Sequence, residues 1–245
     1  MSDILLVHGA AHGAWCWHRV IPALQAMGHR ARAIDLPSHG DDGTDPATVT
    51  LDSYAEAVLR ALDSTTILVG HSMGGFPITA AAQAAPDRIA ALIYVCAYLP
   101  KAGHTLAEMR RAGPRQPLAG AFRIDESRTT FTFDPAKTTA LFYHDCPADD
   151  LALAQRRLCR QPIAPQETPI PDTARAEALP RFYIRCTDDR VIPPDYQETM
   201  AAGLPPDHIS TLPCGHSPFF AAPDALAQRI DAISRRPLST LPDSR

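Results

Sequence analysis

The segment that most constrains the fold is a short apolar run that ends in a serine flanked by glycines. Residues 65–69 (TTILV) lead directly into residues 70–75 (GHSMGG), and an alanine-rich stretch follows. A G-x-S-x-G pattern between a strand and a helix is typical of a tight turn that exposes the serine hydroxyl at a sheet edge. Gly70 and Gly74 would let the strand and the helix approach each other closely. The segment predicts a strand, a turn and a helix in succession, with Ser72 as the candidate nucleophile.

Short apolar runs and helix-like stretches alternate along much of the chain. The apolar runs predict strands buried on both faces, and they cover residues 4–7, 31–36, 65–69, 89–95, 181–186 and 208–212. The predicted helices cover residues 15–27, 51–62, 72–85 and 223–234. Asp52 and Ser53 are the capping candidates of the second helix. This order predicts an α/β fold with a mainly parallel sheet of about six strands, flanked by helices.

The alternation breaks in the middle of the chain, where charged residues and proline become more frequent. We interpret this region as a cap inserted over the carboxyl edge of the sheet, with a helix over residues 149–160. The predicted division is a core of residues 1–103 and 174–236, a cap of residues 104–173, and a flexible tail of residues 237–245.

A serine hydroxyl needs a base to become a good nucleophile, and the chain has 10 histidines. His216 follows the last predicted strand and precedes the final helix, which fits the chain order serine, acid, histidine. His8 and His71 lie in strand–turn motifs and are expected to be structural or pocket residues. His208 begins a strand and would face the opposite end of the sheet. The others lie on early loops, helices or the cap, so His216 is the predicted base.

The base needs a carboxylate that fixes its tautomer and stabilises the imidazolium. Asp188 and Asp189 both follow the strand predicted over residues 181–186. Residues 189–193 (DRVIP) match a D-x-x-[VI]-P form. This form is common after the corresponding strand in hydrolases with the chain order serine, acid, histidine, which favours Asp189 over Asp188. Asp35, at the end of the second strand, is expected to be a structural turn residue.

A tetrahedral intermediate also needs hydrogen-bond donors for its oxyanion. The Met73 N–H, directly after the nucleophile, is one candidate. The second is expected in the loop after the first strand, where small residues let the backbone come close, and Ala10 is our choice. These residues together predict a serine hydrolase.

Composition and charge narrow the remaining choices. The formal net charge is −4, which favours neither a nucleic-acid nor an anionic-membrane partner. The arginine clusters at 110, 111 and 115 and at 156, 157 and 160 are expected to be solvated helix faces. The 6 cysteines form no C-x-x-C pair and no metal-type cluster with histidine. We expect reduced thiols, no metal, no cofactor and, because no signal-like or membrane-spanning segment is evident, a cytoplasmic location.

Several segments resemble the plant methylesterase and hydroxynitrile lyase group of the α/β-hydrolase superfamily. They are residues 6–15 (LVHGAAHGAW), 28–29 (GH), 70–75 (GHSMGG), 146–154 (CPADDLALA) and 186–193 (CTDDRVIP). The resemblance implies an α/β-hydrolase fold that needs no metal or cofactor. It also implies Ser72, Asp189 and His216 as a catalytic triad, with Ala10 and Met73 as oxyanion donors.

At two positions this chain differs from the lyases of the group, and these positions bear on whether it is a lyase or an esterase. Its lyases carry a threonine at the position of Gly9 and a lysine directly after the catalytic histidine, where this chain has Ser217. We therefore expect a carboxylic ester hydrolase that acts through an acyl-enzyme on small or medium esters, including methyl or aryl esters. The alternatives are a lyase, lactonase or perhydrolase with the same triad, and a ligand receptor with a residual hydrolase fold. The sequence leaves the oligomeric state open.

Overall fold

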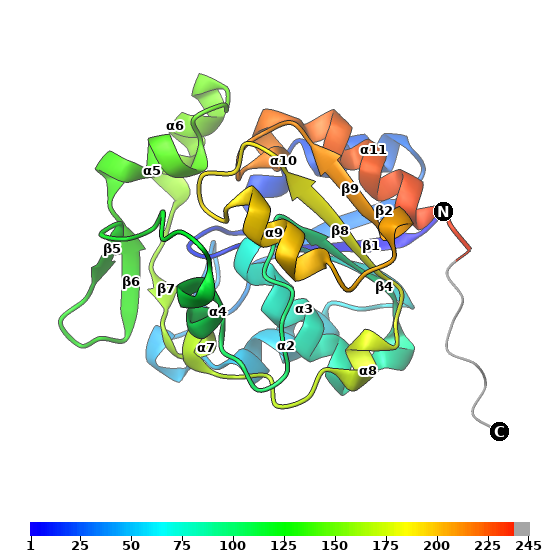
Figure 1. Cartoon of the computed structure of the whole chain (residues 1–245), viewed down its shortest axis with the longest axis horizontal. Coiled ribbons are helices and arrows are strands. Elements are labelled where there is room, and N and C mark those ends of the chain that lie inside the picture. Colours follow the sequence, from blue (N-terminus) through cyan, green and yellow to red (C-terminus); the bar gives the residue numbers. More distant parts are fainter. Residues whose placement is uncertain (238–245) are drawn as a thin grey trace.

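One six-stranded sheet forms the centre of the molecule (Figure 1). A computed structural model describes residues 1–237, so the tail predicted over residues 237–245 lies, except for Pro237, outside the described residues. The strand order is β2-β1-β3-β4-β8-β9, and each neighbouring pair is parallel. The strands are β1 (Asp3–Val7), β2 (Arg30–Ile34), β3 (Thr66–His71), β4 (Ile89–Val95), β8 (Arg181–Cys186) and β9 (Ile209–Leu212). The predicted parallel sheet of about six strands is confirmed.

Helices cover both faces of this sheet, which explains why its strands are continuous apolar runs. All six residues of β3 are buried. On one face lie α1 (Val20–Ala26) and α11 (Pro223–Ser234); on the other lie α2 (Leu51–Arg60), α3 (Gly75–Ala84) and α8 (Ala174–Glu177) (Figure 1). Two further helices follow the last two strands, α9 (Pro194–Ala201) and α10 (Pro218–Ala221). Within residues 1–237, no helix has both the length and the apolarity required to cross a bilayer.

The first predicted helix, over residues 15–27, is interrupted. A short 3-10 turn, η1 (Ala14–Trp17), comes first, and α1 begins only at Val20. Pro22 has no N–H and is tolerated only in the first turn of a helix, so a continuous helix through it is disfavoured.

The start of α2 also differs from the prediction. Thr50, and neither Asp52 nor Ser53, is its N-cap. The Thr50 side chain accepts a hydrogen bond from the Ser53 N–H, and the Ser53 hydroxyl accepts one from the Thr50 N–H. This reciprocal capping box satisfies two backbone donors and sets the first residue of the helix.

Between β4 and β8 the chain forms elements outside the main sheet. They are α4 (Leu106–Ala112), β5 (Phe122–Ile124), β6 (Thr130–Phe133), α5 (Pro135–Phe142), α6 (Ala148–Arg157), β7 (Gln161–Pro162) and α7 (Ala164–Glu167). The three strands form an antiparallel sheet, drawn in green at the left of Figure 1. The helix predicted over residues 149–160 is α6, which ends three residues earlier. We propose to treat residues 104–173 as the cap.

Polar side chains of this cap bind backbone groups of the core. Asp145 Oδ2 accepts a hydrogen bond of 2.6 Å from the N–H of Gly215, in the loop after β9. Gln161 Oε1 accepts one of 3.0 Å from the N–H of Ala11 and lies 2.9 Å from His39 Nε2. Cap and core loops are therefore joined at the carboxyl edge of the sheet, where the candidate catalytic residues lie.

Buried histidines add to these connections between loops. Besides His216, four imidazoles that are almost fully buried lie there: His8, His12, His39 and His71. The Leu36 N–H donates to His8 Nε2 over 3.1 Å, and the Tyr143 hydroxyl donates to His12 Nε2 over 2.7 Å. Burial lowers the pKa of all four imidazoles, and that of His12 to about 4. The folded protein therefore holds these rings neutral, because an imidazolium would lose its hydration, and His8 and His12 would also lose their acceptor nitrogens.

We expect the stability to fall as the pH drops below about 6.5. Each ring binds a proton more readily in the unfolded chain, where the pKa is about 6.5, than in the folded one. The stabilisation is therefore complete above the unfolded pKa and is lost as the pH falls toward the folded pKa. For His12 alone the loss at about pH 4 is about 3 kcal/mol.

Urea unfolding at about pH 7.5, 6.5 and 5.5 measures this effect before most carboxyl groups titrate. His39→Gln should make the pH dependence shallower, and His104→Gln, at a partly exposed position, is the control for removing a histidine. An unfolding midpoint that stays constant over this range would contradict the assignment.

The turn between β3 and α3 allows no side chain at its glycines. A Cβ on Gly70 would lie 2.5 Å from the Gly74 carbonyl oxygen, and a Cβ on Gly74 would lie 2.7 Å from the carbonyl oxygen of Val7 in β1. The close approach predicted at these glycines is thus present in the structure.

Gly74→Ala should lower the free energy of unfolding by about 1–3 kcal/mol, because the methyl group forces backbone atoms apart. Gly203→Ala is the matched control, since nothing lies within 4 Å of the added methyl there. Chemical denaturation of both variants checks the prediction, which fails if they are equally stable.

Candidate active site

Ser72 lies where β3 ends and the covering helix begins. Residues Ser72–Gly74 form a 3-10 turn, η3, so α3 starts at Gly75 and not at Ser72 as predicted. The φ angle of Ser72 is +55°, in the left-handed region that residues other than glycine seldom adopt. The surrounding structure must hold this strained backbone in place, and such strain is common at functional sites.

His216 and Asp189 lie on loops at the same edge of the sheet. His216 Nε2 is 3.0 Å from Ser72 Oγ, and His216 Nδ1 is 2.8 Å from Asp189 Oδ2. The side chains of His216 and Asp189 are 1% and 0% exposed. The structure thus brings together the three side chains that chain order singled out. In this arrangement Asp189 can orient the imidazole while Nε2 takes the hydroxyl proton.

The two competing aspartates lie elsewhere. Asp188 is exposed, and its N–H donates to the Cys214 carbonyl. Asp35 Oδ1 accepts a hydrogen bond of 2.6 Å from the Ala14 N–H, and Asp35 Oδ2 accepts one of 3.0 Å from the Asp41 N–H. Asp35 thus orders two loops, as expected of a structural turn residue.

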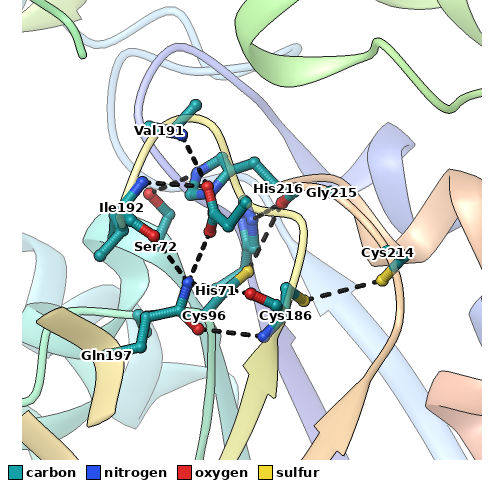
Figure 2. A network of polar contacts seen from close by, with 12 residues as sticks. His71, Ser72, Cys96, Cys186, Val191, Ile192, Gln197, Cys214, Gly215 and His216 are labelled. Atoms are coloured by element: carbon teal, nitrogen blue, oxygen red, sulfur yellow. Dashed lines mark hydrogen bonds and ion pairs between the residues drawn. The ribbon is translucent and has the colours of Figure 1, made fainter. Parts of the chain in front are cut away.

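The Asp189 carboxylate is held by four hydrogen bonds. Its Oδ1 accepts from the N–H groups of Val191 (2.7 Å) and Ile192 (2.9 Å), and its Oδ2 accepts from Gln197 Nε2 (2.9 Å) as well as from His216 (Figure 2). Sequence reasoning missed Gln197, which is fully buried on α9. Its amide also donates to the Ile192 carbonyl and accepts from the Cys186 N–H. A buried carboxylate with all these partners can remain charged.

His71 fixes the backbone beside the base. Its Nε2–H donates a hydrogen bond of 2.7 Å to the His216 carbonyl, and the two ring centres are 4.7 Å apart (Figure 2). Burial lowers the pKa of His71 well below its usual range, and the nearby His216 acts in the same direction. His71 therefore serves as a neutral donor that positions His216, consistent with its expected role as a structural or pocket residue.

Ala10 and Met73 both line the cavity in front of Ser72. Among residues 1–237, no backbone acceptor is found for either N–H, so both remain available to a bound group. The Ala10 carbonyl accepts a hydrogen bond of 2.7 Å from His12 Nδ1–H, which orients the first loop. His12 was set aside in the sequence because of its position on an early loop, yet it too lines the cavity.

The cavity itself is walled by aromatic side chains of the cap. About 410 Å³ of space lies here if the part open to solvent is included, and the volume that admits the centre of a water molecule is about 30 Å³. Its cap wall includes Leu106, Arg110, Leu118, Phe122, Phe131, Phe133, Phe142 and Gln166. Nothing in the spacing of these phenylalanines along the sequence indicated that they face Ser72. This lining suits a ligand with an apolar part.

One group of possible metal ligands occurs within residues 1–237, namely His71, Cys96 and His216. Both ring nitrogens of His216 already face Ser72 and Asp189, and His71 donates its Nε2 proton to the His216 carbonyl. Cys96 Sγ also lies 3.5 Å from that carbonyl, and burial raises the pKa of its thiol to about 12. All three residues therefore take part in the hydrogen-bond network, and His71 Nδ1 is the one ring nitrogen of the group without a partner within the described residues.

Comparison with known proteins agrees with this fold. A family model described as "Alpha/beta hydrolase family" matches residues 4–229. Methylesterase 18 of Arabidopsis thaliana is 33% identical over 247 residues, which cover 91% of this chain and 94% of the relative. The pyrethroid hydrolase of Sphingobium wenxiniae is 34% identical over 250 residues, covering 97% and 89% of the two chains. The predicted resemblance to plant methylesterases is confirmed.

A solved structure shows the same fold. The crystal structure of a pyrethroid hydrolase from Sphingobium faniae JZ-2 matches with a TM-score of 0.87 and 31% identity, covering 96% of this chain and 98% of that one. The six-stranded parallel sheet, the turn at Ser72 and the family match over most of the chain all agree: the protein is a member of the alpha/beta hydrolase family.

Proposed function

We propose that this protein is a serine esterase with Ser72 as nucleophile, His216 as base and Asp189 as the orienting acid. The observation that carries the proposal is the continuous path from Ser72 Oγ through His216 to Asp189, with distances of 3.0 and 2.8 Å, at the wall of an apolar cavity. A hydroxyl becomes a nucleophile when such a base accepts its proton.

The proposed reaction proceeds in two halves. Ser72 Oγ attacks the ester carbonyl while His216 Nε2 accepts the hydroxyl proton, and the N–H groups of Met73 and Ala10 stabilise the oxyanion. His216 then protonates the leaving alcohol, which leaves an acyl group on Ser72. Water enters, His216 removes a proton from it, and the acid is released as Ser72 regains its proton.

The substrate that we propose is a small or medium ester with an apolar or aromatic part, including methyl or aryl esters. The aromatic wall formed by Phe122, Phe131, Phe133 and Phe142 supports an apolar ligand. The names of the relatives, methylesterases and pyrethroid hydrolases, support an ester as the reacting group.

Gly9 favours ester hydrolysis over the lyase alternative. A Cβ at this position would lie 2.8 Å from His71 Nδ1 and 2.9 Å from Ser72 Cβ. The threonine implied for lyases of the resembling group would therefore need the nucleophile turn to shift. Ser217 takes the position of their lysine, and its hydroxyl is buried without a hydrogen-bond partner in the described chain.

Replacing the nucleophile is the direct test. Ser72→Ala should lower kcat on nitrophenyl esters by on the order of 10⁴-fold or more, because no other group can form the acyl-enzyme. Ser127→Ala, at an exposed serine between β5 and β6, should keep the wild-type rate. If Ser72→Ala retains more than a trace of hydrolysis, the mechanism is wrong.

The two neighbouring aspartates provide a matched pair. Asp189→Asn should lower kcat by on the order of 10⁴-fold, because the amide no longer selects the His216 tautomer that accepts the proton. Asp188→Asn should change kcat by no more than about threefold, because its side chain is exposed. Steady-state kinetics of both folded variants decides which aspartate orients His216. Equal losses of kcat would refute the choice of Asp189.

A further inference from the structure

Arg110 is a partly buried cation without a partner at the wall of the cavity. It lies on α4 in the cap, and its guanidinium carbon is 4.4 Å from the ring centre of Phe122. Among residues 1–237, no carboxylate lies within 4 Å of its guanidinium and no group accepts a hydrogen bond from it. Some other arginines of the cap are paired, for example Arg115 with Asp195 at 2.7 Å and Arg123 with Asp134 at 2.8 Å.

This arrangement is energetically unusual. Burial lowers the pKa of the Arg110 guanidinium, and the more distant Tyr98 and Glu167 only partly oppose the shift. Arginine nevertheless stays charged, because its pKa is normally above 12. A cation that has lost part of its hydration and gained no counter-ion costs free energy, which a bound anion would recover. Arg110 is thus less exposed to solvent than the solvated helix face expected from the sequence, whereas Arg111 and Arg115 are exposed.

The surroundings of Arg110 are suited to an anion. A second hollow adjoins the reactive cavity and shares Arg110, Tyr98 and Phe122 with it. Arg111 and Arg115 line this hollow as well, and none of its lining residues is an aspartate or glutamate. A ligand extending from Ser72 past the aromatic wall would thus meet a region of positive charge.

We propose that Arg110 is a specificity-determining residue that binds a carboxylate at the far end of the substrate. The inference rests on the proposed esterase function and narrows its substrate class to half-esters. In such a molecule the ester carbonyl reaches Ser72, an apolar spacer contacts the phenylalanines, and a free carboxylate meets the guanidinium. Arginine is suited to this role because its planar fork can donate two parallel hydrogen bonds to one carboxylate.

The test compares monomethyl and dimethyl esters of the same dicarboxylic acids, such as adipate, suberate and sebacate. The two series share a spacer and a reacting group and differ in one negative charge. Wild-type protein should prefer the monomethyl ester of at least one acid. In Arg110→Met the ratio of kcat/KM for monomethyl over dimethyl ester should fall by about 10–100-fold, mainly through KM.

Two further variants separate charge from packing. Arg110→Lys should retain part of the preference, because a lysine keeps the charge but not the fork. Arg156→Met removes an exposed cation from α6 of the same cap, at a position outside the cavity, and should leave the ratio unchanged. If wild type shows no preference, or Arg110→Met lowers both rates equally, the inference is overturned.

A binding measurement distinguishes this inference from the esterase proposal. Calorimetry with Ser72→Ala protein and unreacted monomethyl ester reports carboxylate binding without turnover, and the added Arg110→Met substitution should weaken that binding about 10–100-fold. Binding that does not depend on Arg110 overturns the inference, even if the esterase is confirmed. If wild type hydrolyses no ester of either series and Arg110-dependent binding persists, the esterase proposal fails and the carboxylate site stands.

Discussion

The candidate site depends on one steric constraint, the contact of the start of α3 with the ends of β1 and β3. The backbone atoms approach so closely that Gly70 and Gly74 have no room for a side chain. This contact leaves Ser72 on a left-handed turn, with its Oγ in the cavity and directed at His216. Because all six strands are parallel, the loops after β8 and β9 open at the same edge, and their residues reach Ser72.

The polar groups behind Ser72 are satisfied almost entirely by the protein. Asp189 accepts four hydrogen bonds, and Gln197 binds the carboxylate, the Ile192 carbonyl and the Cys186 N–H at once. Groups fixed in this way need little reorganisation when charge moves during a reaction. On the opposite side of Ser72 the aromatic side chains of the cap form an apolar wall, and electrostatic interactions are stronger beside apolar groups than in water. The site thus combines an ordered hydrogen-bond network behind Ser72 with an apolar cavity in front of it.

Sequence reasoning located the six strands of the main sheet within about two residues, because burial on both faces makes each parallel strand a continuous apolar run. It did not find the three short antiparallel strands of the cap. It selected Ser72, Asp189 and His216 from motif and chain order, and His216 lies within hydrogen-bond distance of both other side chains. It did not find Gln197, whose role depends on α9 packing behind the loop that carries Asp189. No local pattern marks such a residue, since a buried glutamine and an exposed one look the same in a helix.

The sequence by itself determined the order of strands and helices, the turn at Ser72 and the candidate acid and base. These features follow from short-range rules of periodicity, glycine placement and chain order. Only the tertiary structure decided what surrounds Ser72: the aromatic wall, the neutral histidines between loops and the unpaired charge of Arg110. Each of these depends on segments more than about 30 residues apart meeting at one edge, so the environment of each side chain is set by packing and not by its neighbours in sequence.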